Sequence, residues 1–171
     1  EQHWLYREQI LNRKRIAIVG GGHCGLALAK LMSSLNYDVH VFDHRSTVLQ
    51  QFSTLDMVRF HEIKDLSQIG EKILAPELTS VVVMTPNFQL DAQALLGLHQ
   101  FPFPFVGVMG SPAKIANIQR HLRENDVPTA WIDQLKAPVG LPLDSDTPEE
   151  IAVSVAAELL QERNVKRTIP K

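Results

Sequence analysis

Cysteine is almost absent from this sequence, since Cys24 is the only one among 171 residues. An internal disulfide is therefore excluded, and the composition fits a reducing compartment. The sequence also lacks any run of 18 apolar residues and any signal-peptide pattern, so we expect a cytoplasmic protein without a membrane partner. Its net charge of −2 gives no general attraction to nucleic acid, and no nucleic-acid partner is expected.

Recognisable catalytic and metal-binding patterns are missing as well. The seven histidines show no HExxH-type spacing, and the lone cysteine disfavours a structural zinc site. Neither a Ser-His-Asp order nor a nucleophile elbow can be identified. The acidic pair Glu149-Glu150 is explained by helix capping. We therefore predict no metal site and no catalytic residue, which leans away from an enzyme without excluding one.

What the sequence does have is the composition of an ordinary globular domain, with 44% hydrophobic and 21% charged residues. We expect residues 1–14 to form a lead-in helix or linker, residues 15–163 a Rossmann-like dinucleotide-binding domain, and residues 164–171 a tail. The sequence does not begin with methionine, so whether it is part of a longer protein stays open.

The chain is organised around a glycine-rich turn near its start. Ile16–Val19 has the continuous apolar character of a buried parallel strand and ends at Gly20-x-Gly22-x-x-Gly25. The apolar residues that follow have the spacing of one helix face and are Leu28, Leu31, Met32 and Leu35. In such a unit Gly20 permits the tight turn, Gly22 lets a pyrophosphate approach the backbone, and Gly25 lets the helix pack closely on the strand. The positive end of the helix then faces the bound anion.

A second strand, Asp38–Asp43, follows this helix and ends in an acidic residue at about the offset expected for a dinucleotide site. Asp43 is predicted to accept hydrogen bonds from a ribose diol, and its charge disfavours a 2′-phosphate. The alternative is an aspartate that is simply solvated at the end of a strand. Arg45 leaves an NADP-like ligand as a further alternative, because a nearby arginine can accommodate a 2′-phosphate.

Strands and helices alternate along the rest of the chain. The further expected strands are Met57–Phe60, Ser80–Thr85 and Phe105–Met109, and the expected helices are Thr47–Phe52, Asp65–Lys72, Leu90–Leu98, Pro112–Glu124 and Pro148–Glu162. This alternation predicts an α/β fold with a doubly wound, mainly parallel sheet and helices on both faces.

Ligands of such sheets bind beyond the carboxyl ends of the strands, where the strand order reverses. Thr85 ends one strand, and Gly110 and Ser111 follow another. The predicted cofactor-binding residues are therefore Gly20, Gly22, His23, Gly25, Asp43, Thr85, Gly110 and Ser111.

Two residues of the turn have alternative interpretations. His23 can donate to an anion or merely cap the helix. Cys24 lies at a helix N-terminus, which can lower the pKa of a thiol, but it also precedes Leu28 by four residues on the apolar face. We favour a core role for Cys24 over a nucleophilic one.

Several motifs occur together that are not general features of Rossmann folds. In order, they are Gly20-Gly21-Gly22-His23, Val82-Val83-Met84-Thr85, Gly107-Val108-Met109-Gly110-Ser111, Ala137-Pro138-Val139-Gly140-Leu141 and Thr147-Pro148-Glu149-Glu150-Ile151-Ala152. With them, the chain resembles the C-terminal Rossmann domain of the xanthine dehydrogenase accessory family (XdhC/CoxI). Two departures from the family pattern are Phe88, where members often have His, and Pro112-Ala113 before Lys114, where members tend to have arginines.

The resemblance implies a protein that binds molybdenum cofactor, as molybdopterin or its dinucleotide form, and assists its insertion into a molybdenum hydroxylase such as xanthine dehydrogenase. The glycine-rich turn and Asp43 suit the phosphate and ribose of such a ligand. The alternatives are an NAD-dependent oxidoreductase and a nucleotide-sensing regulatory domain. The oligomeric state stays open, with a homodimer as one option.

Overall fold

The computed structural model describes residues 14–165, and its strands form a five-stranded sheet in the order β3-β2-β1-β4-β5. The strands are β1 (Arg15–Val19), β2 (Asp38–Asp43), β3 (Val58–Glu62), β4 (Thr79–Val83) and β5 (Phe105–Val108). Each neighbouring pair is parallel. The predicted doubly wound α/β fold is confirmed.

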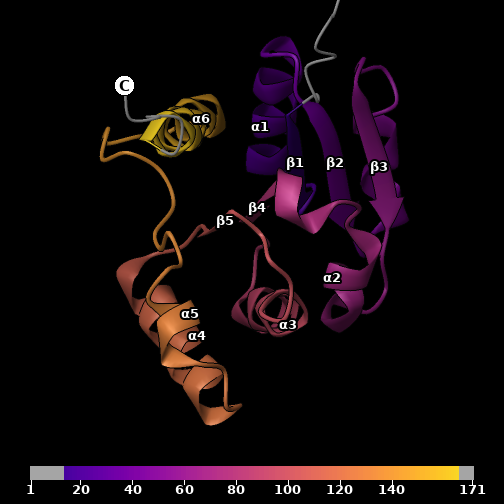
Figure 1. Ribbon diagram of the computed structural model, residues 1–171. Helices are drawn as coiled ribbons and strands as arrows, with labels where there is room; N and C mark the ends of the chain where they lie inside the picture. The colour runs from indigo at the N-terminus through magenta and orange to yellow at the C-terminus, as the bar shows by residue number, and fades with distance from the viewer. Residues whose placement is uncertain (1–13, 166–171) are drawn as a thin grey trace, which may run out of the picture.

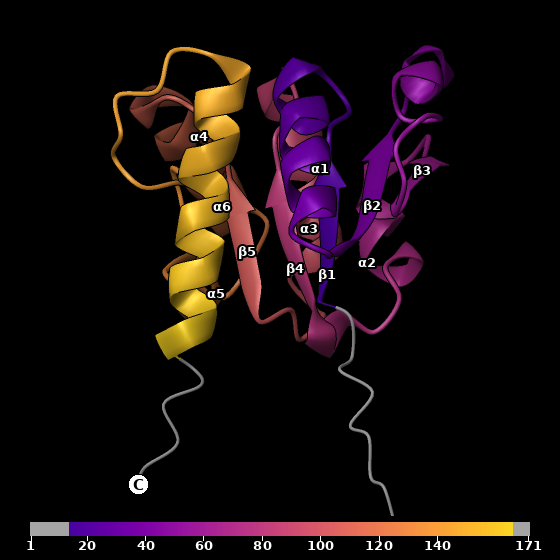
Figure 2. The same cartoon turned by 90° about the horizontal axis from the view of Figure 1, so that it is seen from above.

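Helices cover both faces of this sheet. They are α1 (His23–Ser34), α2 (Ile69–Lys72), α3 (Phe88–Leu98), α4 (Pro112–Glu124), α5 (Thr129–Ile132) and α6 (Pro148–Val165), with 3-10 turns η1 (Ser46–Gln51), η2 (Leu66–Gln68) and η3 (Pro76–Leu78). Figure 1 shows α1 and α6 on one side of the sheet and α2, α3, α4 and α5 on the other. In Figure 2, α1 and α6 lie side by side in front of the strands.

The central strand β1 is apolar on both faces because both are covered. Ile16 and Ile18 are fully buried in the cluster under α1 and α6. Ala17 and Val19 are fully buried in the opposite cluster, which includes residues of α3 and α4. The alternation of side chains along a strand thus divides one short apolar segment between two cores.

The two helices that cover one face follow their predicted patterns. Leu28 and Met32 of α1 are fully buried, whereas Leu35 lies just beyond the helix and is 39% exposed. At the start of α6, the Glu150 amide donates to Thr147 Oγ1 at 3.2 Å and the Thr147 amide donates to Glu150 Oε2 at 3.0 Å. This reciprocal pair is the predicted capping box. The predicted apolar face of α6 is buried and consists of Ala152, Val155, Ala156 and Leu159.

Several short segments differ from the sequence-based expectation. The segment expected as a helix over Thr47–Phe52 is the 3-10 helix η1, and η3 was not predicted. The helix expected over Asp65–Lys72 is divided into η2 and α2, because the Asp65 side chain accepts a hydrogen bond from the Ser67 amide and starts a 3-10 turn. Helix α5 was not predicted. The segment after it pairs with the free side of β5, where the Val108 amide donates to the Lys136 carbonyl at 2.9 Å.

The expected lead-in and tail lie almost entirely outside the described residues. Lys14 is the one residue of the lead-in that is described. Asn164 and Val165 are the described residues of the tail, and they end helix α6. Within residues 14–165, no helix has the length and apolar character needed to cross a lipid bilayer.

Candidate functional site

The predicted site lies at the reversal point of the sheet, where the carboxyl ends of β1 and β4 meet. Strand β1 pairs with β2 on one side and β4 on the other, and the helices that follow β1 and β4 cover opposite faces. A crevice at this position is where open α/β sheets bind ligands. The structure brings the glycine-rich turn, Asp43 and Thr85 together at this point.

Two glycines of the turn are required by the backbone itself. Gly20 has φ of +113°, and a Cβ atom there would lie 2.7 Å from the main-chain oxygen of Met84. A Cβ atom on Gly25 would lie 2.0 Å from the main-chain oxygen of Gly20. Gly20 therefore allows the turn against β4, and Gly25 allows α1 to begin directly against the end of β1.

Gly22 differs from both, because a Cβ atom there would meet nothing within 4 Å. It is the N-cap residue of α1, with extended backbone angles that any residue can adopt. Within the described chain, no side chain caps this end of α1, and its first turn holds no acidic residue. Asn87 caps α3 and Ser111 caps α4 in the usual way. The open space and the amide groups of α1 suit a phosphate.

Asp43 lies beside this turn but is not solvated, since the residue is only 3% exposed. Its Oδ2 atom accepts hydrogen bonds from the Gly21 amide at 2.7 Å and from Arg45 Nη2 at 2.9 Å. Its Oδ1 atom accepts from the amide and the Nε atom of Arg45, both at 2.9 Å. Burial raises the pKa of Asp43, but the hydrogen bonds from Arg45 and Gly21 outweigh it, so the pKa lies below its usual value. The alternative of a solvated aspartate at the strand end is therefore wrong.

Thr85 lies on the other side of the reversal point and belongs to a buried polar cluster. Its amide donates to Asp91 Oδ1 at 3.0 Å, and its hydroxyl lies within hydrogen-bond distance of the same oxygen and of the Asn87 carbonyl oxygen. The other oxygen of Asp91 forms an ion pair with the ammonium group of Lys114. Lys114 also donates to the carbonyl oxygens of Thr85 at 3.1 Å and Met109 at 3.3 Å. The cluster thus ties the ends of β4 and β5 to α3 and α4.

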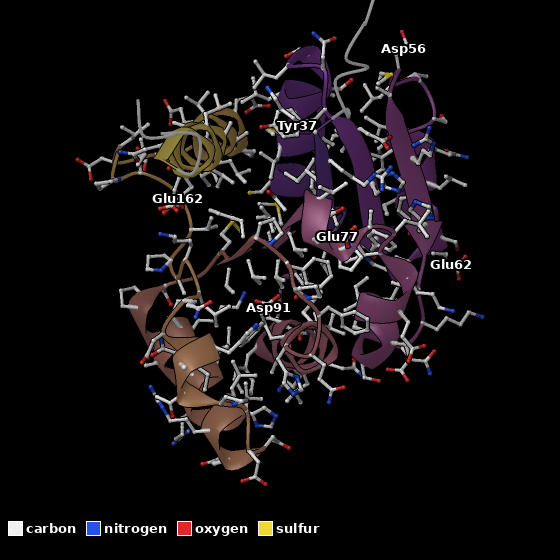
Figure 3. All side chains as sticks on the ribbon, viewed as in Figure 1. Tyr37, Asp56, Glu62, Glu77, Asp91 and Glu162 are labelled. Atoms are coloured by element: carbon white, nitrogen blue, oxygen red, sulfur yellow. The ribbon has the colours of Figure 1, made fainter. Side chains whose placement is uncertain are left out.

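Asp91 is the fully buried member of this cluster. In Figure 3 it lies on the inner side of α3, between that helix and the sheet. Burial raises the pKa of Asp91 above its ordinary value, although Lys114 and Thr85 act in the opposite direction.

Gly110 and Ser111 are connected to the same cluster through Lys114. A Cβ atom on Gly110 would lie 2.8 Å from Lys114 Cδ. The Ser111 hydroxyl accepts a hydrogen bond from the Lys114 amide at 3.3 Å and so caps α4, as predicted. Their part in ligand binding stays a prediction. His23 is exposed at the first position of α1, and its role in anion binding also stays a prediction.

Sequence reasoning did not find the buried partnership of Asp91 and Lys114. A signal was present in α3, where Asp91, Ala94, Leu95 and Leu98 share one helix face and all four are buried. A lone acidic residue on an apolar helix face needs a buried partner. The sequence alone did not indicate that Lys114, on the next helix, would supply it.

The comparison with protein families decides what kind of Rossmann domain this is. A family model described as the XdhC Rossmann domain matches residues 16–159. The chain belongs to the XdhC family. This confirms the resemblance drawn from the sequence motifs.

Proteins named as xanthine dehydrogenases or their subunits are among the relatives of this XdhC domain. It is 31% identical over 153 residues to the uncharacterized protein YqeB of Escherichia coli (strain K12), covering 89% of this chain and 28% of YqeB. It is 28% identical over 163 residues to a probable xanthine dehydrogenase subunit of Bacillus subtilis (strain 168), covering 93% of this chain and 46% of that protein. A crystal structure of a xanthine dehydrogenase from Bacillus halodurans matches 93% of this chain and 45% of its own, with a TM-score of 0.76 and 26% identity. The chain therefore spans less than half the length of these relatives.

Cys24 lies in the first turn of α1 of this XdhC domain and packs, partly buried, against the apolar cluster under α1 and α6. Burial raises the pKa of its thiol, and the negative charge of Glu149 at the start of α6 adds to the effect. A thiol with a raised pKa is a poor nucleophile near neutral pH, which supports the core role.

Substitution of Cys24 by Ser should cost stability without affecting the site. We expect the free energy of unfolding to fall by about 1 kcal/mol, because a hydroxyl group replaces a thiol that packs on apolar side chains. Denaturant titration of Cys24→Ser and Cys24→Ala measures the effect. Unchanged stability together with loss of ligand binding in both variants would show instead that the thiol is functional.

A metal site of the usual kind is not formed by residues 14–165, in which no three or more His, Cys, Asp or Glu side chains are grouped to hold an ion. At the predicted site, the features that suit a ligand are instead the amide groups and open space at the start of α1 and the cation of Arg45.

Proposed function

We propose that this XdhC-family chain binds molybdenum cofactor, as molybdopterin or its dinucleotide form, and assists its insertion into a molybdenum hydroxylase of the xanthine dehydrogenase type. The cofactor is cargo in this scheme, and its molybdenum supplies redox chemistry only in the client enzyme. The names of the B. subtilis relative and of the B. halodurans structure support a link to that class of enzyme.

The observation that carries the proposal is the start of α1. Gly22 leaves open space at a helix N-terminus that no side chain caps within the described residues, and this end lies at the reversal point of the sheet. Every form of the cofactor carries a phosphate group, which the amides and the positive end of α1 would hold. Thr85, Gly110 and Ser111 are then the proposed contacts on the side of β4 and β5.

The second part of the proposed function is the release of the bound cofactor to a client enzyme, not a catalytic reaction. A carrier must give up its ligand to a partner, so the ligand should be held by groups at the surface of the domain. Gly22 and His23 lie at the exposed start of α1 and satisfy this requirement. We assign no residue of the predicted site to proton transfer, and the ammonium group of Lys114 beside it is engaged by Asp91 and two carbonyl groups.

Replacement of Gly22 by Val tests the proposal. The valine side chain would fill the space meant for the phosphate, while the open surroundings should let the fold survive. The full chain and molybdenum cofactor should raise the activity of an apo xanthine dehydrogenase-type hydroxylase, and Gly22→Val should abolish this effect. Its affinity for the cofactor should fall about 100-fold or more, since charged hydrogen bonds contribute about 1.5–3 kcal/mol each.

Ala130→Val is the matched control, because Ala130 is exposed on α5 and away from the turn. It should bind cofactor and activate the hydroxylase like the wild type. Full activation by Gly22→Val would contradict the proposed site. Steady turnover of NAD⁺ or NADH with alcohols, aldehydes or hydroxy acids would favour an NAD-dependent oxidoreductase. An effect of NAD on partner binding in the absence of molybdenum cofactor would favour a nucleotide-sensing regulator.

A further inference from the structure

The hydrogen bonds of Asp43 decide what kind of group can bind at the end of β2. A carboxylate has about four lone-pair positions for hydrogen bonds. Asp43 already accepts four, from the Gly21 amide and from the amide, Nε and Nη2 of Arg45. A ribose diol needs acceptors for its two hydroxyl hydrogens. In this arrangement Asp43 has none to give unless the pair with Arg45 is broken.

The pair is well protected against such an exchange. The Asp43 side chain is 2% exposed and that of Arg45 is 38% exposed, so the carboxylate lies inside and the guanidinium covers it. Loss of the Arg45 side chain would leave the buried negative charge of Asp43 without its cation. The partners left would be the Gly21 amide, the main-chain amide of residue 45 and the ring of His44 at 3.5 Å. A neutral diol cannot replace the charge of the guanidinium.

Arg45 itself still has donors to offer. A guanidinium group carries five N–H bonds, and the contacts with Asp43 use one on Nε and one on Nη2. The contacts seen within residues 14–165 leave the other three N–H bonds of this partly exposed group without an acceptor. The fixed fork of a guanidinium matches a phosphate, and Asp43 holds it in one orientation.

This guanidinium is continuous with the start of α1. Gly21 and Arg45 both donate to the same oxygen of Asp43, and Gly22, the next residue, is the open position of the turn. The single negative charge of Asp43 is balanced by Arg45, so the positive end of α1 is not opposed at this position. The carboxylate of Glu149 also acts on the first turn of α1, at Cys24. At the end of β2, however, the donors of Arg45 and the balanced charge of Asp43 favour an anion rather than a sugar.

We propose that the end of β2 is a subsite for a phosphate monoester, in which Arg45 supplies the donors and Asp43 positions Arg45. The inference rests on the proposed function, because it assumes that the turn before α1 holds the ligand. The monoester can come from a nucleotide 2′-phosphate, or from the single phosphate of molybdopterin, which Arg45 and the start of α1 would then hold together; the chemistry recognised is the same. Asp43 in this view is a positioning residue rather than the ribose acceptor expected from the sequence.

Binding of NADP⁺ and NAD⁺ to the full chain, measured by calorimetry, tests the nucleotide source. These two ligands differ only in the 2′-phosphate. We expect NADP⁺ to bind about 10-fold to 100-fold more tightly, as charged hydrogen bonds allow. Arg45→Leu should remove this preference by weakening NADP⁺ and leaving NAD⁺ equal or tighter. Preference for NAD⁺ in the wild type, or equal weakening of both ligands in Arg45→Leu, would overturn the inference.

Binding of molybdopterin to the same variants tests the pterin source. Arg45→Leu should weaken it at least about 10-fold. Arg59→Leu is the matched control, because Arg59 also pairs with an aspartate of β2, but with Asp38 at the opposite end of the strand. If NADP⁺ does not bind and molybdopterin binds equally to wild type and Arg45→Leu, the inference fails while the proposed function stands. If molybdopterin binds as well to Gly22→Val as to the wild type, the proposed site at the start of α1 fails, and if it does not bind to the wild type, the proposed function fails.

Discussion

Substitution of Gly25 by Ala should remove about 4 kcal/mol or more from the free energy of unfolding, a large share of the stability of a domain of this size. The reason is steric and lies in the backbone. A Cβ atom on Gly25 would lie 2.0 Å from the main-chain oxygen of Gly20 and 3.1 Å from its carbonyl carbon. Neither atom can move independently, because Gly20 directly follows β1, its amide donates to the Phe42 carbonyl of β2 at 2.8 Å, and its Cα side faces the main chain of Met84 after β4. Relief would require α1 to shift away from the end of β1.

Gly22→Ala is the matched control for this variant, since it adds the same methyl group three residues earlier. Its Cβ atom would meet nothing within 4 Å. We expect a loss below about 1 kcal/mol, from the poorer preference of Ala for an N-cap position. Thermal and denaturant unfolding of the two variants measure the difference. If Gly25→Ala were as stable as Gly22→Ala, the close contact between α1 and the turn could not exist as described.

Much of the fold follows from the sequence because the central strand β1 is apolar on both faces and helices α4 and α6 begin with clear caps. Strand β2 and helix α4 have the predicted bounds, and the capping box before α6 is formed as expected. These features depend on local spacing, which a sequence displays directly. The XdhC family could be identified for a related reason, since its motifs occur in a fixed order along the chain.

The unpredicted parts depend on contacts between segments distant in sequence. Helix α5 has only four residues, which gives little apolar spacing to recognise. The segment at Lys136 pairs with β5, which lies about 30 residues earlier in the sequence. The position of Asp43 could be predicted from its spacing, but the state of its carboxylate could not. Whether a strand-end aspartate offers its oxygens to a ligand depends on the rotamer of Arg45, which places two nitrogen atoms against it.

Substitution of Lys114 by Met should lower the free energy of unfolding at pH 7 by about 3–5 kcal/mol, the usual cost of removing one partner from a buried ion pair. The ammonium group of Lys114 forms an ion pair with Asp91, whose residue has no exposed surface. Methionine has a similar volume but leaves the carboxylate without its cation. Lys72→Met is the control, because Lys72 is exposed on α2, and it should change stability by less than about 0.5 kcal/mol.

The stability lost in Lys114→Met should depend on pH in a direction set by Asp91. Burial already raises the pKa of this carboxyl with Lys114 present, and loss of the cation raises it further. The folded variant then binds a proton at a pH where the unfolded chain does not, so protonation stabilises it. The difference between wild type and Lys114→Met should therefore shrink as the pH is lowered from 7 towards the raised pKa of Asp91. The double variant Asp91→Asn/Lys114→Met should regain most of the loss at pH 7, since no charge stays buried. A deficit in Lys114→Met that grows at lower pH, or that the second substitution leaves unchanged, would show that the ion pair does not account for the stability of this cluster.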